Sequence, residues 1–478
     1  MVRDAACAAL SLIAPAAAHF LLRLYVGRSL GEEALGLYAL TWAIYGIALI
    51  PGTLGAGPAL ARYSAQLRAS AARRSRVLSE GLVQAFAGGT LAAALLATTS
   101  GALGTRLFGL ESLSSHLLLA ALVLPGAAAG KAVAGYLNGQ RRMAAFAALA
   151  CAQGAAAAVL TVLLVGCGCG ISGALVGSLL PAGVLGLASL ALVGAELRRS
   201  LTQARACRLS AALLRFGWYA TMTNGVGVVQ GYTDTLMLGA LLGGRDVGLY
   251  AAALLALQAV RLPGAAAQLA VNPRIAALWP RGDTAGIARV VNPTMGLVAA
   301  LVLPAGFACI LGGDVLLRLA VGEPFTVAAP ALALLMPGGM VAAIWAVAGT
   351  LLSSTGHQRT AFRVALFAVS INIPLNYVFI RLAGLNGAAL ATSLSLGVGC
   401  FLEGYLAQRR SGVRLRWQRI AVIGALLVAA AWLLPQLGAR PQSLQAVAGW
   451  WLMSTILCAR TVVDRHTRRA LFARLTGR

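Results

Sequence analysis

Charged residues are scarce in this 478-residue chain, and acidic residues are scarcer still. Only 11% of the residues are charged, and just 13 are Asp or Glu, whereas a typical soluble domain is about 25% charged. Because 59% of the residues are hydrophobic, too few polar side chains remain to cover a surface in water. These absences exclude a soluble globular protein and indicate a chain whose solvent is the hydrocarbon of a bilayer.

The sequence also lacks the signatures of enzymes and metal sites. It contains no HExxH, GxSxG or CxxC motif, and the stretch from Gly126 to Lys131 has neither the spacing nor the Ser or Thr of a phosphate-binding loop. The eight cysteines lie mostly in apolar runs, and Cys167 and Cys169 alone are too few ligands for zinc. We therefore predict a protein that is not an enzyme, with no catalytic residue, metal or cofactor.

Basic residues are the one abundant charge, with 38 Lys and Arg giving a formal net charge of +25. They fall in short clusters between apolar runs, and no basic face with interleaved aromatic residues is present. The clusters are typical of charges that orient membrane helices, and nucleic acid is not an expected partner.

Apolar runs of about 20 residues, the length that crosses a bilayer, recur throughout the chain. Fourteen such runs predict an all-α membrane protein with about fourteen spans. They lie near 5–27, 35–57, 81–103, 115–137, 143–165, 171–193, 213–240, 248–270, 291–312, 327–350, 361–381, 385–407, 420–436 and 443–459.

An even number of spans places both termini on one side of the membrane. Assigned to alternate loops, 30 of the basic residues fall on the side of the termini and seven on the other, while Arg261 lies within a span. Positive charge favours the cytoplasm, so we expect both termini to be cytoplasmic. The loops on the opposite side are short, which argues against a membrane glycosyl polymerase or ligase.

The chain repeats itself at a separation of 212 residues. Gly36-Leu-Tyr-Ala39 aligns with Gly248-Leu-Tyr-Ala251, and Pro51-Gly52 aligns with Pro263-Gly264. A shift of six spans preserves orientation, so the halves are predicted to be parallel repeats. We expect a six-helix lobe (1–195), a basic cytoplasmic linker (196–212), a second six-helix lobe (213–408), and two further helices with a basic cytoplasmic tail (409–478).

Several segments resemble the polysaccharide and O-antigen flippases of the Wzx type. They are Gly31-Glu-Glu-Ala-Leu-Gly-Leu-Tyr-Ala-Leu, Asp234-Thr-Leu-Met-Leu-Gly with Val247-Gly-Leu-Tyr-Ala-Ala, Pro273-Arg-Ile-Ala-Ala-Leu and Gly384-Leu-Asn-Gly-Ala-Ala-Leu-Ala-Thr. The superfamily of these flippases also holds the lipid II flippases and the multidrug and toxic compound extrusion (MATE) transporters.

The resemblance implies a V-shaped, two-lobed transporter in the bacterial inner membrane that works by alternating access. Its cargo would be an oligosaccharide on an undecaprenyl pyrophosphate carrier. Its partners would be membrane lipids, a polysaccharide polymerase and other assembly proteins. The drug-extrusion branch usually has an acidic residue in its first helix, and this chain has none between Ala5 and Gly27. A drug or cation antiporter and a lipid II flippase remain the alternatives within the same fold.

A pyrophosphate cargo needs cations inside the membrane, where charges are costly and often functional. Arg261 lies about 20 Å from the outer end of its span, at 1.5 Å per residue, so it either binds the head group, snorkels or forms a structural pair. Arg23 and Lys131 lie nearer to helix ends and have the same alternatives, whereas Arg28 is closer to the interface. His19, four residues before Arg23, is a candidate for proton coupling.

Asp234 is the candidate gate residue, because the repeat aligns its neighbour Thr235 with Arg23. We predict that Arg23 and Asp234 form an ion pair when the periplasmic gate is closed. Reversing either charge alone should then reduce transport, and exchanging the two residues should restore part of it. An exchange variant that is as inactive as the single reversals would reject this pair.

Overall fold

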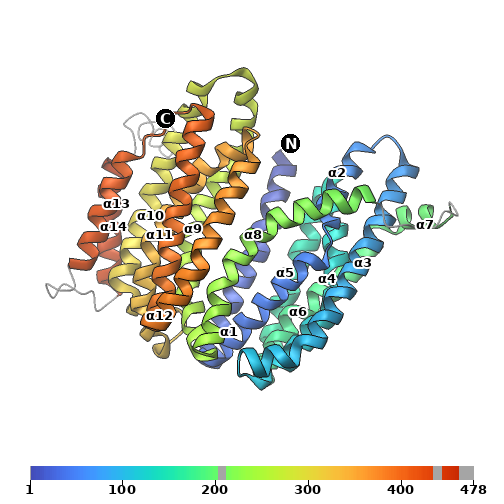
Figure 1. The fold of residues 1–478 in the computed structure, drawn as a ribbon, viewed down its shortest axis with the longest axis horizontal. Helices are drawn as coiled ribbons and strands as arrows, with labels where there is room; N and C mark the ends of the chain where they lie inside the picture. The colour runs from blue at the N-terminus through green and yellow to red at the C-terminus, as the bar shows by residue number, and fades with distance from the viewer. Residues whose placement is uncertain (1, 203–210, 434–443, 462–478) are drawn as a thin grey trace. The chain divides into compact units, whose positions relative to one another are not determined.

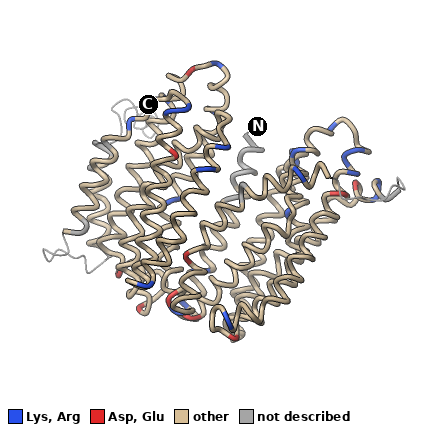
Figure 2. Tube along the Cα trace, viewed as in Figure 1, with Lys and Arg blue, Asp and Glu red and all other residues tan. Residues whose placement is uncertain are grey.

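The protein is helical throughout the part of the chain that the computed structural model describes, residues 2–202, 211–433 and 444–461. The chain divides into two compact units, Met1–Gly248 and Leu249–Arg478 (Figure 1). Each unit is a bundle of long apolar helices, in which buried small residues let the backbones approach closely. Figure 2 shows that most Lys and Arg residues lie near helix ends in each unit, leaving long uncharged stretches between them.

Unit 1 is built around the long helix α1 and holds the first half of the chain. Its helices are α1 (Val2–Gly52), α2 (Ala56–Gln66), α3 (Ala71–Gly101), the π-helical turn η1 (Ala102–Leu107), α4 (Glu111–Gly139), α5 (Met143–Gly166), α6 (Gly170–Ala188), the 3-10 turn η2 (Ser189–Val193), α7 (Gly194–Thr202) and α8 (Ala211–Leu241).

Unit 2 begins within α9 and contains the remaining helices. They are α9 (Gly244–Leu278), η3 (Trp279–Arg281), α10 (Thr284–Ala320), η4 (Glu323–Ala328), α11 (Ala329–Ser354), α12 (Gln358–Ser411), α13 (Gln418–Leu433) and α14 (Leu444–Thr461).

The helices of the described residues account for all fourteen predicted spans. Nine of them are long and apolar enough to cross a membrane. Two of the nine, α1 and α12, each cover two predicted spans, because the backbone leaves helical geometry at Gly31 and at Gly384. The other three predicted spans correspond to α8, α13 and α14. The predicted all-α architecture is thus confirmed.

The internal repeat is visible in the turns between the helices. Glycines with left-handed backbone angles, which residues with a Cβ rarely adopt, recur at separations of 212, 213 and 214 residues. The φ values of the first pair are 86° and 105°, and those of the last are 55° and 56°. The three pairs are Gly31 and Gly243, Gly109 and Gly322, and Gly170 and Gly384.

The compact units do not divide where the repeat does, because α8 lies in unit 1. The segments 1–195, 196–212, 213–408 and 409–478 describe the repeat, and they remain a prediction about domains. Three segments fall outside the described residues: part of the predicted linker (203–210), residues 434–443, where the predicted span 420–436 ends, and the basic tail (462–478).

Within unit 1, α4 packs through glycines on several sides. A Cβ on Gly126 would meet the backbone of Gly183 in α6, and one on Gly135 would meet the backbone of Gly57 in α2. A Cβ on Gly89 of α3 would lie 2.8 Å from the Cα atom of Pro125 in α4. Only glycine allows these backbones to approach so closely, and α4 is thereby held in a defined position and rotation.

Unit 2 contains a buried polar network between α9 and α12. The hydroxyl of Tyr250 donates a hydrogen bond to Thr392 Oγ1 (3.1 Å), and Asn372 Nδ2 donates to Ser395 Oγ (2.9 Å). Ser395 Oγ in turn donates to the carbonyl oxygen of Thr392 (3.1 Å). All four side chains are buried, so these bonds satisfy groups that would be costly to leave unpaired in the membrane.

Candidate functional site

Three of the six candidate residues come together in unit 1. His19 and Arg23 lie one turn apart on the first arm of α1, before the break at Gly31. Lys131 lies on α4, eight residues, or about 12 Å, before the end of that helix at Gly139. Arg23 and Lys131 both lie near enough to the His19 ring to influence it electrostatically. We call His19, Arg23 and Lys131 the cationic cluster.

The side chains of the cluster differ in exposure. Arg23 and His19 are half-buried, while Lys131 is exposed although both of its neighbours, Gly130 and Ala132, are buried. The backbone of α4 is enclosed at this level, since a Cβ on Gly57 would lie 3.0 Å from the Lys131 carbonyl oxygen. The lysine therefore projects from a packed apolar helix, where an ammonium group is costly unless it has a polar partner.

Aromatic residues on the second arm of α1 adjoin the cationic cluster. The rings of His19 and Trp42 meet edge to face, with centroids 4.7 Å apart, and Trp42 meets Tyr45 in the same way at 5.3 Å. Trp42 Nε1 donates a long hydrogen bond to Ser178 Oγ of α6 (3.4 Å). Tyr38 is buried and interacts electrostatically with Arg23.

The break at Gly31 makes this arrangement possible. It has φ 86° and ψ −175°, and a Cβ there would be strained by the backbone angle although no atom lies nearby. The break lets His19 on the first arm meet Trp42 on the second, 23 residues later. In one straight helix these residues would lie about 35 Å apart.

Two other candidates, Asp234 and Arg28, also belong to unit 1. Asp234 is buried on α8, and in the described structure it shares a unit with Arg23 rather than lying in the opposite one. Their proposed pairing stays a prediction. Arg28 is exposed, three residues before the break at Gly31, which agrees with its expected place near a helix end.

Arg261, the sixth candidate, lies in unit 2 on α9 with an exposed side chain. Both Arg261 and Glu403 of α12 act electrostatically on Cys400. The Glu403 carboxylate packs against α11, where a Cβ on Gly349 would lie 2.8 Å from its Oε1. An acidic group therefore lies in the same region as Arg261, which keeps a structural role for this arginine open beside head-group binding.

The sequence analysis missed the aromatic residues of the site. Tyr38, Trp42 and Tyr45 are four and three residues apart, a spacing that places them on one face of a helix. That spacing was a usable signal. Ser178 offers none. Lys131 was a candidate by its charge, but its place beside these residues was not predictable, because only packing brings α4 and α6 to α1. Among the described residues, no group of three or more His, Cys, Asp or Glu lies together.

Chemically, the site combines positive charge with aromatic surface. Guanidinium and ammonium groups bind phosphate oxygens through charge-assisted hydrogen bonds. Aromatic rings present apolar faces, and indole and phenol groups add a polar edge. Such a combination suits a ligand that carries both phosphate and sugar.

Comparison with known proteins identifies relatives for both halves of the chain. The family model "Polysaccharide biosynthesis protein" matches residues 1–279, and the MatE family model matches residues 221–378. A curated protein, the probable low-salt glycan biosynthesis flippase Agl15 of Haloferax volcanii, is 24% identical over 220 residues. That match covers 46% of this chain and 47% of the relative, so the chain matches about half the length of that protein.

Solved transporter structures share the fold over most of the chain. The lipid II flippase MurJ in an inward closed conformation matches with a TM-score of 0.71 at 13% identity, covering both chains completely. An inward-facing multidrug resistance MATE transporter matches with 0.69 at 13% identity, over 85% of this chain and 98% of that one. A transporter from Pyrococcus furiosus, described as having a binding pocket of reverse polarity, matches with 0.61 at 14% identity, over 86% and 95%. At these identities the likeness establishes the fold.

Proposed function

Because the chain belongs to the polysaccharide biosynthesis protein family, we propose that it is a flippase for an undecaprenyl-pyrophosphate-linked oligosaccharide. It would work in the bacterial inner membrane, with both termini cytoplasmic, by alternating access around a cationic cavity. A polysaccharide polymerase would consume the product on the far side. The name of the Haloferax relative, a probable glycan biosynthesis flippase, supports the cargo class.

The observation that carries this proposal is the cationic cluster beside Trp42. Arg23 and Lys131, which lie within electrostatic reach of His19, are both basic, and the edge-to-face contact at 4.7 Å places the Trp42 indole against the His19 ring. The cluster would hold the pyrophosphate, and Trp42 would lie against the first sugar. The polyprenyl tail has no need of the site, because it is as apolar as the lipid around it.

The sign of the charge separates this function from drug or cation export. A cationic drug requires acidic groups where its positive charge rests, since like charges repel strongly in a medium of low dielectric constant. The cationic cluster presents the opposite charge. A lipid II flippase shares the pyrophosphate chemistry and the fold, so only the choice of sugar distinguishes that alternative.

Leaflet transfer in proteoliposomes tests the proposal directly. Purified protein is reconstituted with a fluorescent undecaprenyl-pyrophosphate oligosaccharide, and exposure of the sugar is followed with a membrane-impermeant reagent. We expect transfer at least about tenfold faster than in protein-free liposomes. Lipid II and a cationic dye serve as competing cargoes. Transport of the dye alone would contradict the proposal, and faster transfer of lipid II than of the oligosaccharide would favour the alternative flippase.

A further inference from the structure

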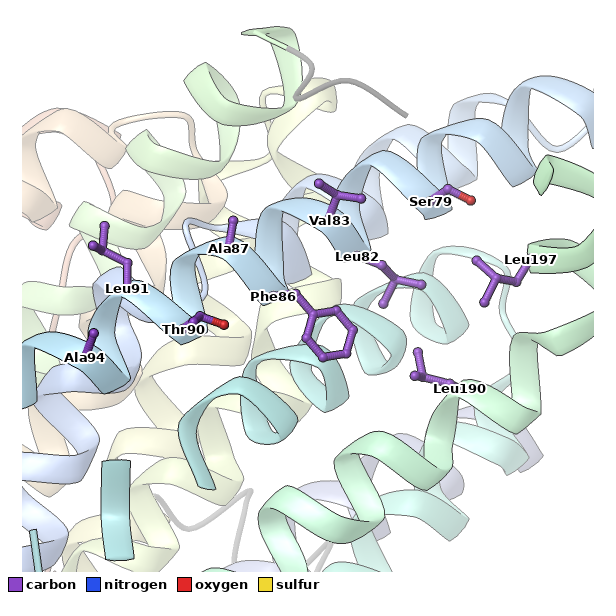
Figure 3. A pocket seen from close by; sticks show the side chains of 10 residues that line it. All are labelled: Ser79, Leu82, Val83, Phe86, Ala87, Thr90, Leu91, Ala94, Leu190 and Leu197. Atoms are coloured by element: carbon purple, nitrogen blue, oxygen red, sulfur yellow. The ribbon is translucent and has the colours of Figure 1, made fainter. Parts of the chain in front are cut away.

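A long apolar groove lies on unit 1, outside the cationic cluster. It has a volume of about 910 Å³ and runs along α3 from Ser79 to Ala94, opposite Leu190 of η2 and Leu197 of α7. Figure 3 shows Phe86 pointing into the space between α3 and these two leucines. From Ser79 to Ala94 the helix rises about 22 Å, at 1.5 Å per residue.

The groove exists because the chain changes direction after α6. That helix ends at Ala188, a 3-10 turn follows, and the short helix α7 then runs beside α3. Arg142 holds this segment in place: its Nη1 donates to the Leu192 carbonyl oxygen (3.1 Å) and lies 3.7 Å from Glu196 Oε1. A long 3-10 turn tethered in this way leaves a space beside α3, and an uninterrupted α6 would not leave that space.

One end of the groove is basic. On α3, Arg73 and Arg76 lie in the two turns before Ser79, and both are exposed. On α7, Arg198 follows the lining residue Leu197 and is also exposed. Two carboxylates lie nearby, and each faces one arginine: Glu80 Oε1 lies 3.0 Å from Arg76 Nε, and Glu196 Oε1 lies 3.7 Å from Arg142 Nη1. Arg73 and Arg198 add two further positive charges, so the rim carries net positive charge.

Helix α7 has the character of an interfacial helix. Among its nine residues, Glu196, Arg198 and Arg199 are charged, and Leu197 between them is apolar. A short helix of this kind lies at the boundary between head groups and acyl chains. With α7 at this boundary, the basic end of the groove would be at head-group level and its apolar length would extend into the hydrocarbon.

We propose that this groove binds an anionic phospholipid, with an acyl chain along α3 and its phosphate at Arg76 and Arg198. One leaflet contributes about 15 Å of hydrocarbon, half of the usual 30 Å, so a tilted groove of about 22 Å accepts a chain that ends near the middle of the bilayer. The basic rim selects anionic head groups. This site is separate from the cargo site, and it holds whether or not the proposed cargo is right.

Photo-crosslinking of the full-length protein tests this site. The protein is reconstituted with a phosphatidylglycerol that carries a diazirine in its acyl chain, and the labelled peptides are mapped by mass spectrometry. We expect labels between residues 79 and 94 and between 190 and 197. Ala87→Trp, which fills the groove from an exposed position, should lower this labelling at least about fivefold. Ala155→Trp, an equally exposed position on α5, should not.

Head-group choice supplies the second measurement. A phosphatidylcholine probe should label the groove at least about threefold less than phosphatidylglycerol, and Arg198→Glu should remove the difference. Equal labelling by the two probes in the unaltered protein, or undiminished labelling in a folded Ala87→Trp variant, would overturn the proposal. Displacement of the probe by undecaprenyl phosphate at equal concentration would also overturn it, by assigning the groove to the carrier. The thermal stability of each variant shows that it is folded.

Discussion

If the proposed function is right, replacing Arg23 with glutamate should lower the rate of oligosaccharide transfer about a hundredfold. A hydrogen bond to a charged group contributes about 1.5–3 kcal/mol, and each 1.4 kcal/mol is about tenfold in rate. Reversal would remove that contact and add a charge that repels the proposed pyrophosphate. The measurement is the initial rate of leaflet transfer in proteoliposomes at equal protein content.

Graded substitutions separate the charge of Arg23 from its shape. Arg23→Lys keeps the charge but loses the planar fork that binds two phosphate oxygens, and we expect about a tenfold loss. Lys131→Gln should lower the rate of transfer by about the same factor. Because both cations act on one ligand, the double variant should lose less than the product of the two single losses.

Arg106→Glu provides the matched control for these variants. Arg106 is exposed on η1 and is not part of the cationic cluster. The same reversal there should leave transfer within about twofold of the unaltered protein. If Arg23→Glu transferred the cargo as fast as Arg106→Glu, the cluster would not bind the head group.

Replacing Gly36 with valine destabilises the protein by about 3 kcal/mol or more. A Cβ on Gly36 would coincide with the carbonyl oxygen of Gly244, and a Cβ on Gly248 with that of Glu32. Gly36 and Gly248 are also partners in the repeat, and each would place its Cβ close to the backbone nitrogen of the other, at 3.0 and 3.1 Å. Here α1 and the start of α9 cross backbone to backbone.

Thermal unfolding in detergent, followed by size-exclusion chromatography, measures this effect. We expect the apparent Tm of Gly36→Val to fall by about 5–10 °C, or the folded peak to be lost. Gly227→Val is the control, because Gly227 lies within α8 and a Cβ there meets no atom within 4 Å. An equal fall in Tm for both variants would show that the close contact between α1 and the start of α9 tolerates a side chain no worse than an open position on α8 does.

The local properties of the sequence were sufficient to predict the spans and to detect the repeat and the family resemblance. Hydropathy is summed over each run of about 20 residues, so α5 and α11 could be located without knowing their neighbours. The apolar runs 5–27 and 35–57, and likewise 361–381 and 385–407, were predicted as separate spans, and α1 and α12 break between them at Gly31 and Gly384. Charge is equally local, which brought Arg23, Lys131 and Arg261 to attention.

Which residues meet was decided by tertiary structure alone. His19 and Arg23 share a helix face, but Lys131 joins them only because glycines seat α4 against its neighbours. Trp42 reaches His19 through the break at Gly31, and the groove forms because Arg142 tethers the turn after α6. Helix packing depends on how well surfaces from distant parts of the chain fit together. Because lipid is as apolar as the helices, no hydrophobic force draws particular helices together, and composition does not show which surfaces fit. The sequence thus determined which segments cross the bilayer, whereas packing decided which of their side chains form a site.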